Sequence, residues 1–230
     1  LSGSPNWTDL DGLDSGRSQR ESRGMLRALT LDQIQTRAWE LLSSAPSERE
    51  SPLRVATLAT VDAAGQPQAR QVVLRSCDPS TGSVEVYTDA RSPKVAELRR
   101  EPRAALCCYD PVRQLQLRLS GPVTIHVGDE RSAEVWREAG IYARRDYLGP
   151  SAPGTPLDDP SQADPRPEQA GDPGANDADA GVSGEASGEN LAILRLTVER
   201  LDWLVLDRAG HRRAELRRTG AGWSARWLLP

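Results

Sequence analysis

Cationic side chains recur beside strand-like segments in the middle of this 230-residue chain. Arg70 and Arg75 bound one segment of alternating apolar and polar residues, and a second such segment, 86–94, ends with Ser92 and Lys94. A phosphate monoester carries about −1.5 to −2 charges at pH 7. Arginine forks and helix N-termini are the usual protein groups that bind it. These residues therefore predict a phosphate pocket, to which Thr88 and Arg91 add donors.

A third segment, 115–121, carries a polar row opposite an apolar row. Because successive side chains of a strand point to opposite faces, Gln116, Arg118 and Ser120 share one face and the intervening leucines share the other. The same rule separates Arg70 from Arg75, which stand five positions apart. Either a bulge realigns these two arginines or they bind different ligands. Spacing alone fits solvated surface arginines equally well.

Composition divides the chain into four regions. Residues 1–23 are rich in Ser, Gly, Asp and Arg and are expected to form a flexible tail. Residues 150–190 are built from Pro, Gly, Ala and acidic residues, which cannot bury enough apolar surface to fold, so we expect a disordered acidic insertion. The net charge of −4 conceals a mildly basic remainder, because residues 158–190 alone contribute −8. Residues 24–149 and 191–230 should together form one folded domain.

The periodicity of this domain is mainly that of short strands with turn signals between them. Helical patterns follow Thr30 and Ser92-Pro93 and cover 129–147, where capping residues stand at the expected starts. We therefore expect a mainly β protein, a split β-barrel of Greek-key type with a few peripheral helices. The expected strands are 54–61, 67–76, 83–88, 104–109, 114–120, 123–127, 191–196, 202–206 and 223–229.

Several other chemistries find no support in the sequence. The two histidines, His126 and His211, have no carboxylate or thiol at ligand spacing, so no metal site is expected. Three cysteines, two of them adjacent, do not make a disulfide framework. Neither a signal peptide nor an apolar run of about 18 residues is recognisable. We expect a cytoplasmic protein with a small-molecule substrate and no membrane partner.

In their order and spacing the three segments resemble the FMN-binding motifs of the pyridoxamine 5′-phosphate oxidase family. The resemblance covers roughly residues 30–127 and resumes near the C-terminus at Leu201-Asp-Trp-Leu204 and Trp227-Leu-Leu-Pro230. Residues 136–156, with Arg144, look closer to a related flavin-binding branch than to the oxidase itself. The motifs are Arg70-Gln-Val-Val-Leu-Arg75, Tyr87-Thr88 with Ser92-Pro-Lys94, and Gln116-Leu-Arg-Leu-Ser-Gly-Pro122.

This resemblance implies a split-barrel homodimer with FMN in the cleft between subunits. Carried onto this chain, the family motifs assign the phosphate to Ser92 and Lys94, and the phosphate or ribityl chain to Tyr87 and Thr88. Gln116 would reach the flavin ring. Arg70, Val72 and Val73 would line the cofactor. Arg75 is included among the cofactor residues, and it stands where relatives place a lysine for the substrate phosphate.

The chain departs from the oxidase pattern at three positions. Pro93 replaces an arginine, and the expected histidine and final arginine near the C-terminus are Ala214 and Leu216. Of that group only Arg212 matches, so the resemblance assigns substrate binding to Arg75 and Arg212 and leaves the identity of the substrate and the catalytic residues unassigned. The expected function is that of an FMN-dependent oxidoreductase. A non-catalytic FMN carrier or sensor is the first alternative. The second is a small-barrel nucleic-acid binder that uses Arg208, Arg212, Arg213, Arg217 and Arg218, although no nucleic-acid partner is expected.

Overall fold

The computed structural model describes residues 24–140, 143–144, 146–159, 188–220 and 222–230. The expected tail, 1–23, lies outside these residues, as does most of the expected insertion. The strands are β1 (Val55–Val61), β2 (Pro67–Asp78), β3 (Ser83–Asp89), β4 (Arg103–Asp110), β5 (Leu115–His126), β6 (Leu191–Thr197), β7 (Arg200–Val205), β8 (Arg212–Thr219) and β9 (Gly222–Leu228). The helices are α2 (Leu31–Ser44), α3 (Pro93–Arg100) and α4 (Glu130–Glu138), with short 3₁₀ turns at Pro52–Arg54 and Gly188–Asn190.

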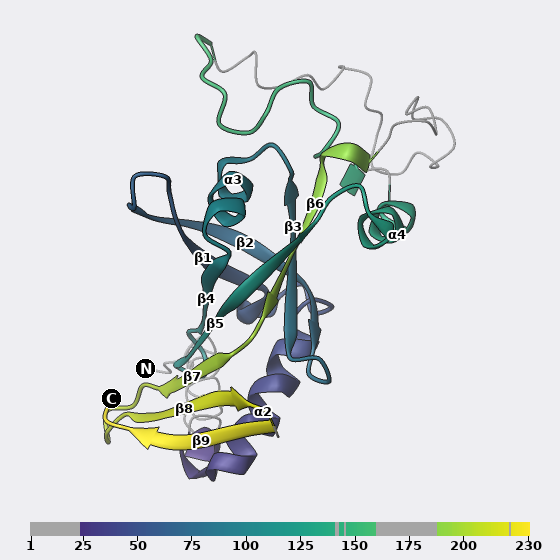
Figure 1. Ribbon diagram of the computed structural model, residues 1–230. Helices are drawn as coiled ribbons and strands as arrows, with labels where there is room; N and C mark the ends of the chain where they lie inside the picture. The colour runs from purple at the N-terminus through teal and green to yellow at the C-terminus, as the bar shows by residue number, and fades with distance from the viewer. Residues whose placement is uncertain (1–23, 141–142, 145, 160–187, 221) are drawn as a thin grey trace, which may run out of the picture.

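Six of the strands close into an antiparallel barrel. Pairing runs from β1 through β2, β3, β6 and β5 to β4, and β4 pairs back onto β1. Strands β7, β8 and β9 continue from the outer half of β5 as an added sheet (Figure 1). The mainly β, split-barrel expectation is confirmed, and so is the small number of helices.

Strand β5 belongs to both parts of the fold. Its first half pairs with β4 and β7, and its second half, from Val123, pairs with β6. A methyl group at Gly121 would lie 1.9 Å from the carbonyl oxygen of Thr197, so only glycine permits this approach between the strands. The separate strands expected at 114–120 and 123–127 are therefore one strand that runs through Gly121.

The helices lie outside the barrel. Helix α2 begins after Thr30, whose side chain and that of Gln33 form a reciprocal capping box. It covers one end of the barrel beside β9, whereas α3 lies at the other end (Figure 1). Helix α4 ends at Glu138, shorter than the expected 129–147, because Ala139 leaves the helical conformation just before Gly140.

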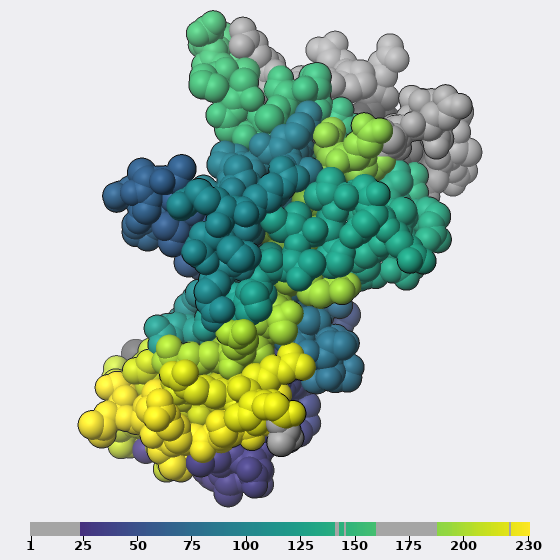
Figure 2. All heavy atoms as spheres, viewed as in Figure 1, coloured from purple at the N-terminus to yellow at the C-terminus, as the bar shows by residue number. Residues whose placement is uncertain are grey.

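One large apolar core fills the barrel and continues beneath α2 and the added sheet, and a smaller apolar cluster includes Val135 of α4 and Leu191 and Ile193 of β6. Alternate residues of the strands supply the large core, among them the fully buried Leu74, Leu106, Leu117 and Trp203. Figure 2 shows the C-terminal strands and α2 packed together as a lobe below the barrel. Within the described residues no helix is long and apolar enough to cross a membrane.

Candidate functional site

The expected phosphate residues gather where β2, β3 and the first turn of α3 meet. Lys94 Nζ donates a hydrogen bond to Thr88 Oγ1 at 2.9 Å. The hydroxyl of Ser92 lies 3.4 Å from that of Thr88. These three residues therefore form one polar cluster, called the Lys94 cluster below, with Arg70 beside it.

Arg70 is held by two residues that sequence reasoning did not select. Its guanidinium makes an ion pair with Glu97 Oε2 at 2.8 Å and contacts the hydroxyl of Thr60. Thr60 in turn donates to the same Glu97 oxygen at 2.5 Å. Thr60 is on β1, Arg70 on β2 and Glu97 on α3, so three elements fix one guanidinium. No local pattern could have predicted this contact, because it joins residues up to 37 positions apart.

Lys94 is the least stabilised cation of the cluster. Partial burial lowers its pKa below the ordinary 10.5, and the positive charge of Arg70 lowers it further. Two cations thus lie close together, and the two carboxylates that act on Lys94 are each paired with an arginine, Asp89 with Arg91 and Glu97 with Arg70. A phosphate would supply the missing negative charge and several acceptor oxygens. The residues present therefore fit the phosphate of FMN.

Ser92 occupies the predicted N-cap position of α3, with Pro93 as the first helical residue. The expected side-chain cap is absent, however, because the Ser92 hydroxyl donates to the Asp89 carbonyl at 2.7 Å instead. Ser92 is 1% exposed. Its hydroxyl thereby fixes the turn between β3 and α3 that carries Thr88 and Lys94.

A bulge decides the placement of Arg75. The pairing of β2 with β3 shifts register between Leu74 and Ser76, so Arg75 is the extra residue. Its guanidinium lies 5.9 Å from the ring centroid of Tyr87. Tyr87 and Thr88 are adjacent in β3 and face opposite sides, so the expected cofactor residues form two groups. Arg75 and Tyr87 make the second group, with Tyr147 close by.

The remaining expected residues lie elsewhere on the barrel. Val72 is part of the buried core, and Val73 pairs with the exposed Val55 of β1. Gln116 pairs with Tyr109 of β4 and Leu204 of β7, far along the sheet from α3. One chain therefore brings Arg70, Thr88, Ser92 and Lys94 together and leaves Gln116 apart.

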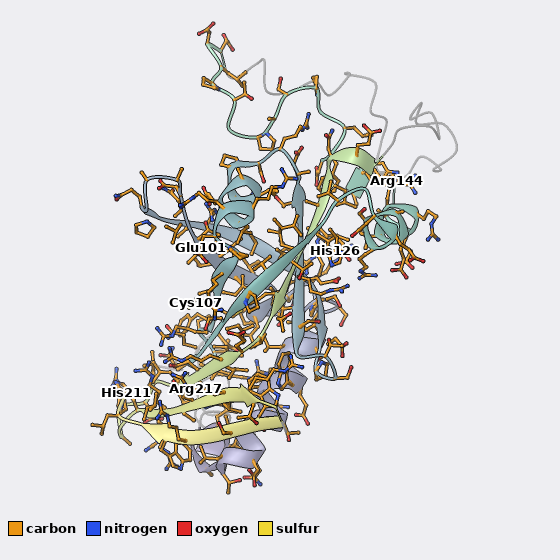
Figure 3. All side chains as sticks on the ribbon, in the orientation of Figure 1. Glu101, Cys107, His126, Arg144, His211 and Arg217 are labelled. Carbon is orange, nitrogen blue, oxygen red and sulfur yellow. The ribbon has the colours of Figure 1, made fainter. Side chains whose placement is uncertain are left out.

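The segment after α4 closes over the start of α3. Arg91 is paired with Asp89 at 2.7 Å, and its guanidinium also donates to the Gly149 carbonyl at 2.9 Å. The Cβ position of Gly154 lies 3.6 Å from the ring of Pro93. Arg144, which stacks on the Trp136 ring at 5.2 Å, anchors the beginning of this segment beside α4 (Figure 3). Residues 136–156 resemble a related flavin-binding branch, and the described part of this segment borders the Lys94 cluster.

The C-terminal arginines lie on two faces of the added sheet. Arg212 stacks on Trp227, with 4.5 Å between guanidinium and ring centroid, on the face that it shares with Ala214. Arg213 and Arg217 lie on the other face, where Asp202 and Glu215 pair with arginines. His211 and Arg217 mark this end of the molecule in Figure 3. Among the described residues, Arg212 therefore makes no contact with the Lys94 cluster, so the structure does not support its expected role in binding the substrate.

Asp202 and Glu215 stand opposite each other on β7 and β8, and both are almost fully buried. Burial raises the pKa of Asp202, but hydrogen bonds from Arg213 and Arg118 outweigh this and the net shift is downward. The hydrogen bond from Arg217 lowers the pKa of Glu215 to about 2. Sequence reasoning missed this pair, because its members meet only through the β7–β8 register.

Comparison with known proteins gives the same picture over the first part of the chain. Residues 36–127 match the family model described as the FMN-binding domain of pyridoxamine 5′-phosphate oxidase. A pyridoxine/pyridoxamine 5′-phosphate oxidase of Anaeromyxobacter dehalogenans is 35% identical over 85 residues, which are 37% of this chain and 42% of that protein. Its counterpart in Rhizobium meliloti is 42% identical over 88 residues, 38% of this chain and 41% of that protein. The chain thus spans less than half the length of these two relatives.

Solved structures extend the likeness of fold to most of the chain. A pyridoxamine 5′-phosphate oxidase-related, FMN-binding protein of Nostoc punctiforme has a TM-score of 0.65 at 24% identity, covering 88% of this chain and 99% of that one. PhzG of Burkholderia lata has a TM-score of 0.62 at 18% identity, covering 85% and 91%. At these identities the likeness shows the fold alone. The match to the FMN-binding domain of pyridoxamine 5′-phosphate oxidase is carried by residues 36–127, and over these residues the chain is similar to that family.

Proposed function

We propose that this protein is an FMN-dependent oxidoreductase whose Lys94 cluster holds the cofactor phosphate. The observation that carries the proposal is the partly buried ammonium of Lys94, which lies beside Arg70 at the start of α3, makes no ion pair with a carboxylate of the described residues, and feels Asp89 and Glu97 only at longer range. A cation kept in such a place without its own carboxylate is costly unless an anion is bound. It lies within the segment that matches an FMN-binding domain.

Each member of the site then has a distinct binding role. Lys94 provides the charge, Thr88 orients the Lys94 ammonium, and Arg70 offers a planar fork kept in place by Glu97. Arginine in such a fixed position binds phosphate oxygens with little further loss of freedom. The bound flavin would supply the redox chemistry, while the protein supplies binding, orientation and electrostatics.

We further propose that two chains assemble so that each contributes to a cofactor site. In one chain Gln116 is separated from the Lys94 cluster by the intervening strands. Val73 and Gln116, which are expected to contact the flavin, each lie next to an exposed apolar or aromatic side chain. Val55, paired with Val73, is 43% exposed, and Tyr109, paired with Gln116, is 41% exposed. A second copy that covers this face would bury them and bring its own Gln116 toward the flavin.

We propose that the substrate of this enzyme differs from the substrate of pyridoxamine 5′-phosphate oxidase. Arg75 packs on Tyr87, and Arg212 packs on Trp227, so both candidate substrate cations are engaged with aromatic rings. Arg213 and Arg118 are both paired with Asp202. These arrangements favour a substrate with less negative charge than pyridoxamine 5′-phosphate. The same observation supports the second candidate, a carrier or sensor that binds FMN without turnover.

Nucleic-acid binding through the C-terminal arginines is the weaker alternative. Arg213 and Arg217 are neutralised by Asp202 and Glu215, and Arg212 covers Trp227 rather than leaving it free to stack on a base.

The three cysteines are free thiols. Free thiols fit a reducing compartment, and we therefore place the protein in the cytoplasm.

The test is FMN binding followed by turnover. FMN titrated into purified protein should be bound, and the double variant Arg70→Ala/Lys94→Ala should lose at least about 100-fold in affinity, since two charge-assisted contacts are removed. Unchanged affinity would remove the phosphate assignment. Loaded protein is then screened for oxidation of pyridoxamine 5′-phosphate and of unphosphorylated amines and alcohols. Turnover of the phosphorylated compound at the rate of a true oxidase would contradict the proposed substrate class. Tight FMN binding without any turnover would favour the carrier.

A further inference from the structure

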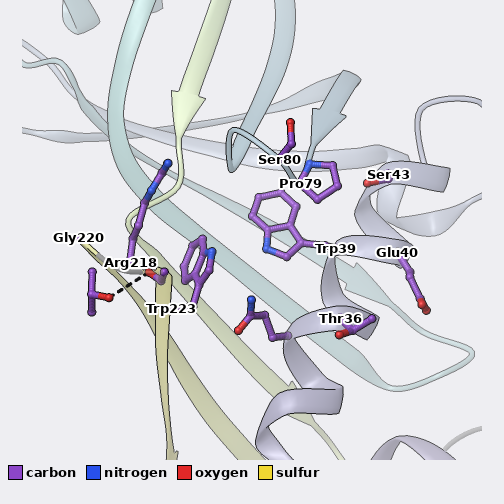
Figure 4. Close-up of a pocket in the computed structure, with 12 residues that line it drawn as sticks. Thr36, Trp39, Glu40, Ser43, Pro79, Ser80, Arg218, Gly220 and Trp223 are labelled. Carbon is purple, nitrogen blue, oxygen red and sulfur yellow. Dashed lines mark hydrogen bonds between the residues drawn. The ribbon is translucent and has the colours of Figure 1, made fainter.

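A cavity lies at the opposite end of the molecule from α3. It has a volume of about 840 Å³ and is enclosed by α2, the turn between β2 and β3, and the β8–β9 hairpin (Figure 4). We call it the hairpin pocket. None of its lining residues belongs to the Lys94 cluster. Its size falls within the roughly 300–1,000 Å³ of pockets that bind small molecules.

Two indole rings make the apolar wall of the hairpin pocket. Trp39 projects from α2 and Trp223 from β9, with ring centroids 6.1 Å apart and planes inclined by 60°. This edge-to-face contact fixes both rings and leaves ring surface that lines the cavity. Both tryptophans also pack on the core, Trp39 being 5% exposed. The wall is therefore rigid, and it suits a flat aromatic ligand that stacks on an indole.

The charge along the same wall is positive. Arg218 is held by a hydrogen bond from its guanidinium to the Thr81 carbonyl at 2.7 Å, and among the described residues it has no carboxylate partner. Its neighbours on the added sheet differ in this respect, because Arg213, Arg217 and Arg226 are all paired with carboxylates. The one acidic residue of the lining, Glu40, is paired with Arg37 at 2.9 Å.

The position of Arg218 is also sterically defined. Gly82, at φ +67° in the β2–β3 turn, has its Cβ position 3.1 Å from the Arg218 guanidinium and 3.6 Å from the Trp223 ring. The turn therefore packs directly on the cation and the indole. Hydroxyl groups of Thr36, Ser43 and Ser80 also line the pocket. Those of Thr36 and Ser80 already donate to the Asp32 carbonyl and to the Asp78 carboxylate, so they can accept further hydrogen bonds from a ligand.

We propose that the hairpin pocket binds a planar aromatic anion of one or two fused rings with a carboxylate or phosphate. The rings stack on the half-buried Trp223, which the almost fully buried Trp39 holds in place, and the anionic group pairs with Arg218. This site is independent of the FMN site, since the two share no residue and lie at opposite ends of the fold.

The probe for a test is 2-naphthoate, titrated calorimetrically into the full chain after saturation with FMN, so that the flavin site is filled. The neutral 2-naphthamide is the ligand control. Arg218→Gln should weaken 2-naphthoate binding about 10-fold or more without affecting 2-naphthamide, because only the anion uses the charge. Thr36→Trp, at an exposed position on α2, should block both ligands by filling the opening. Arg208→Gln, an exposed arginine outside the pocket, should change nothing.

The outcomes separate the pocket from the flavin site. FMN affinity should be the same in all three variants, and a failure of FMN binding in the parent protein would contradict only the function proposed above, since 2-naphthoate can be titrated without it. Absence of 2-naphthoate binding at millimolar concentration overturns the hairpin pocket as a ligand site. So does binding that survives both Arg218→Gln and Thr36→Trp. Circular dichroism of the variants confirms that loss of binding does not come from unfolding.

Discussion

Lys94 and Thr88 are joined by a hydrogen bond of 2.9 Å from the lysine ammonium to the threonine hydroxyl. The bond links the first turn of α3 to the last part of β3. A threonine hydroxyl has two lone pairs and can accept from an ammonium while its proton is given elsewhere. The ammonium keeps two further donors for a ligand. This geometry keeps Lys94 in place before any anion arrives.

Replacing Lys94 by methionine should separate binding from stability. The pKa of Lys94 is lowered by burial and by Arg70, so the folded protein disfavours the charged ammonium that the unfolded chain tolerates. Lys94→Met should therefore raise the FMN dissociation constant about 10- to 100-fold, while the melting temperature of the cofactor-free protein stays the same or rises. Flavin fluorescence and calorimetry measure the two quantities. Arg99→Met, exposed on the same helix, is the control and should leave both unchanged.

FMN affinity should depend on pH in two opposed steps. It should increase as pH rises through about 6, where the phosphate takes its second charge. It should then decrease as pH rises through the pKa of Lys94 in the cofactor-free protein, which lies below 10.5. Binding of the anion favours the charged lysine and so takes up a proton in that alkaline range. Lys94→Met should lose the alkaline decrease and keep the acid step. An alkaline decrease of equal size in the variant would assign it to another group.

The strands and the motif residues could be predicted from the sequence because their signals are local. Alternation between polar and apolar residues located the barrel strands to within about two residues, except that β5 was expected as two strands, and Thr30 and Ser92 marked helix starts correctly. A bulge that would bring Arg75 to the side of Arg70 was one of two possibilities; the β2–β3 pairing contains a bulge at Arg75, but Arg75 lies at Tyr87 and Arg70 at Glu97.

What escaped prediction depends on register between distant strands. The bonds from Arg70 to Thr60 and Glu97 need β1, β2 and α3 in place together. Asp202 faces Glu215 because β7 and β8 pair in the register that places Trp203 opposite Ala214. A shift of one residue would turn these side chains to the other face. The same sensitivity separates Arg212 from Arg213, which the sequence alone could not assign to faces.

The cysteines should be slow to react in the folded protein. Burial raises the pKa of Cys77 and of Cys108 to about 12, and it raises that of Cys107 as well. Since the thiolate is the reactive form, a disulfide reagent at pH 8 should modify at most Cys107, slowly, and all three thiols in denaturant. Cys107→Ser should abolish the reaction of the native protein. Rapid modification of two or more thiols in the native state would show that the barrel opens near β2 or β4.

Acid should weaken the added sheet through Glu215. Its pKa is lowered from 4.5 to about 2, chiefly by the hydrogen bond from Arg217 and further by Arg226 and Arg200. A carboxylate with a depressed folded pKa stabilises the fold fully above its unfolded pKa and loses that contribution as pH falls through the folded value. The stabilisation should therefore be complete above about pH 4.5 and decline from there to about pH 2.

Glu215→Gln tests this origin of acid sensitivity. Glutamine keeps one acceptor oxygen but deprives Arg200, Arg217 and Arg226 of the negative charge that they share, so the free energy of unfolding at pH 7 should fall by about 1–3 kcal/mol. The part of the decline between pH 4.5 and 2 that belongs to Glu215 should disappear. Denaturant titrations at several pH values measure both. Glu134→Gln removes a carboxylate that is 46% exposed and paired with Arg131, and it should change stability little. If Glu215→Gln keeps the full acid decline of the parent protein, the sensitivity comes from other carboxylates, of which Asp202 on the facing strand is the next to replace.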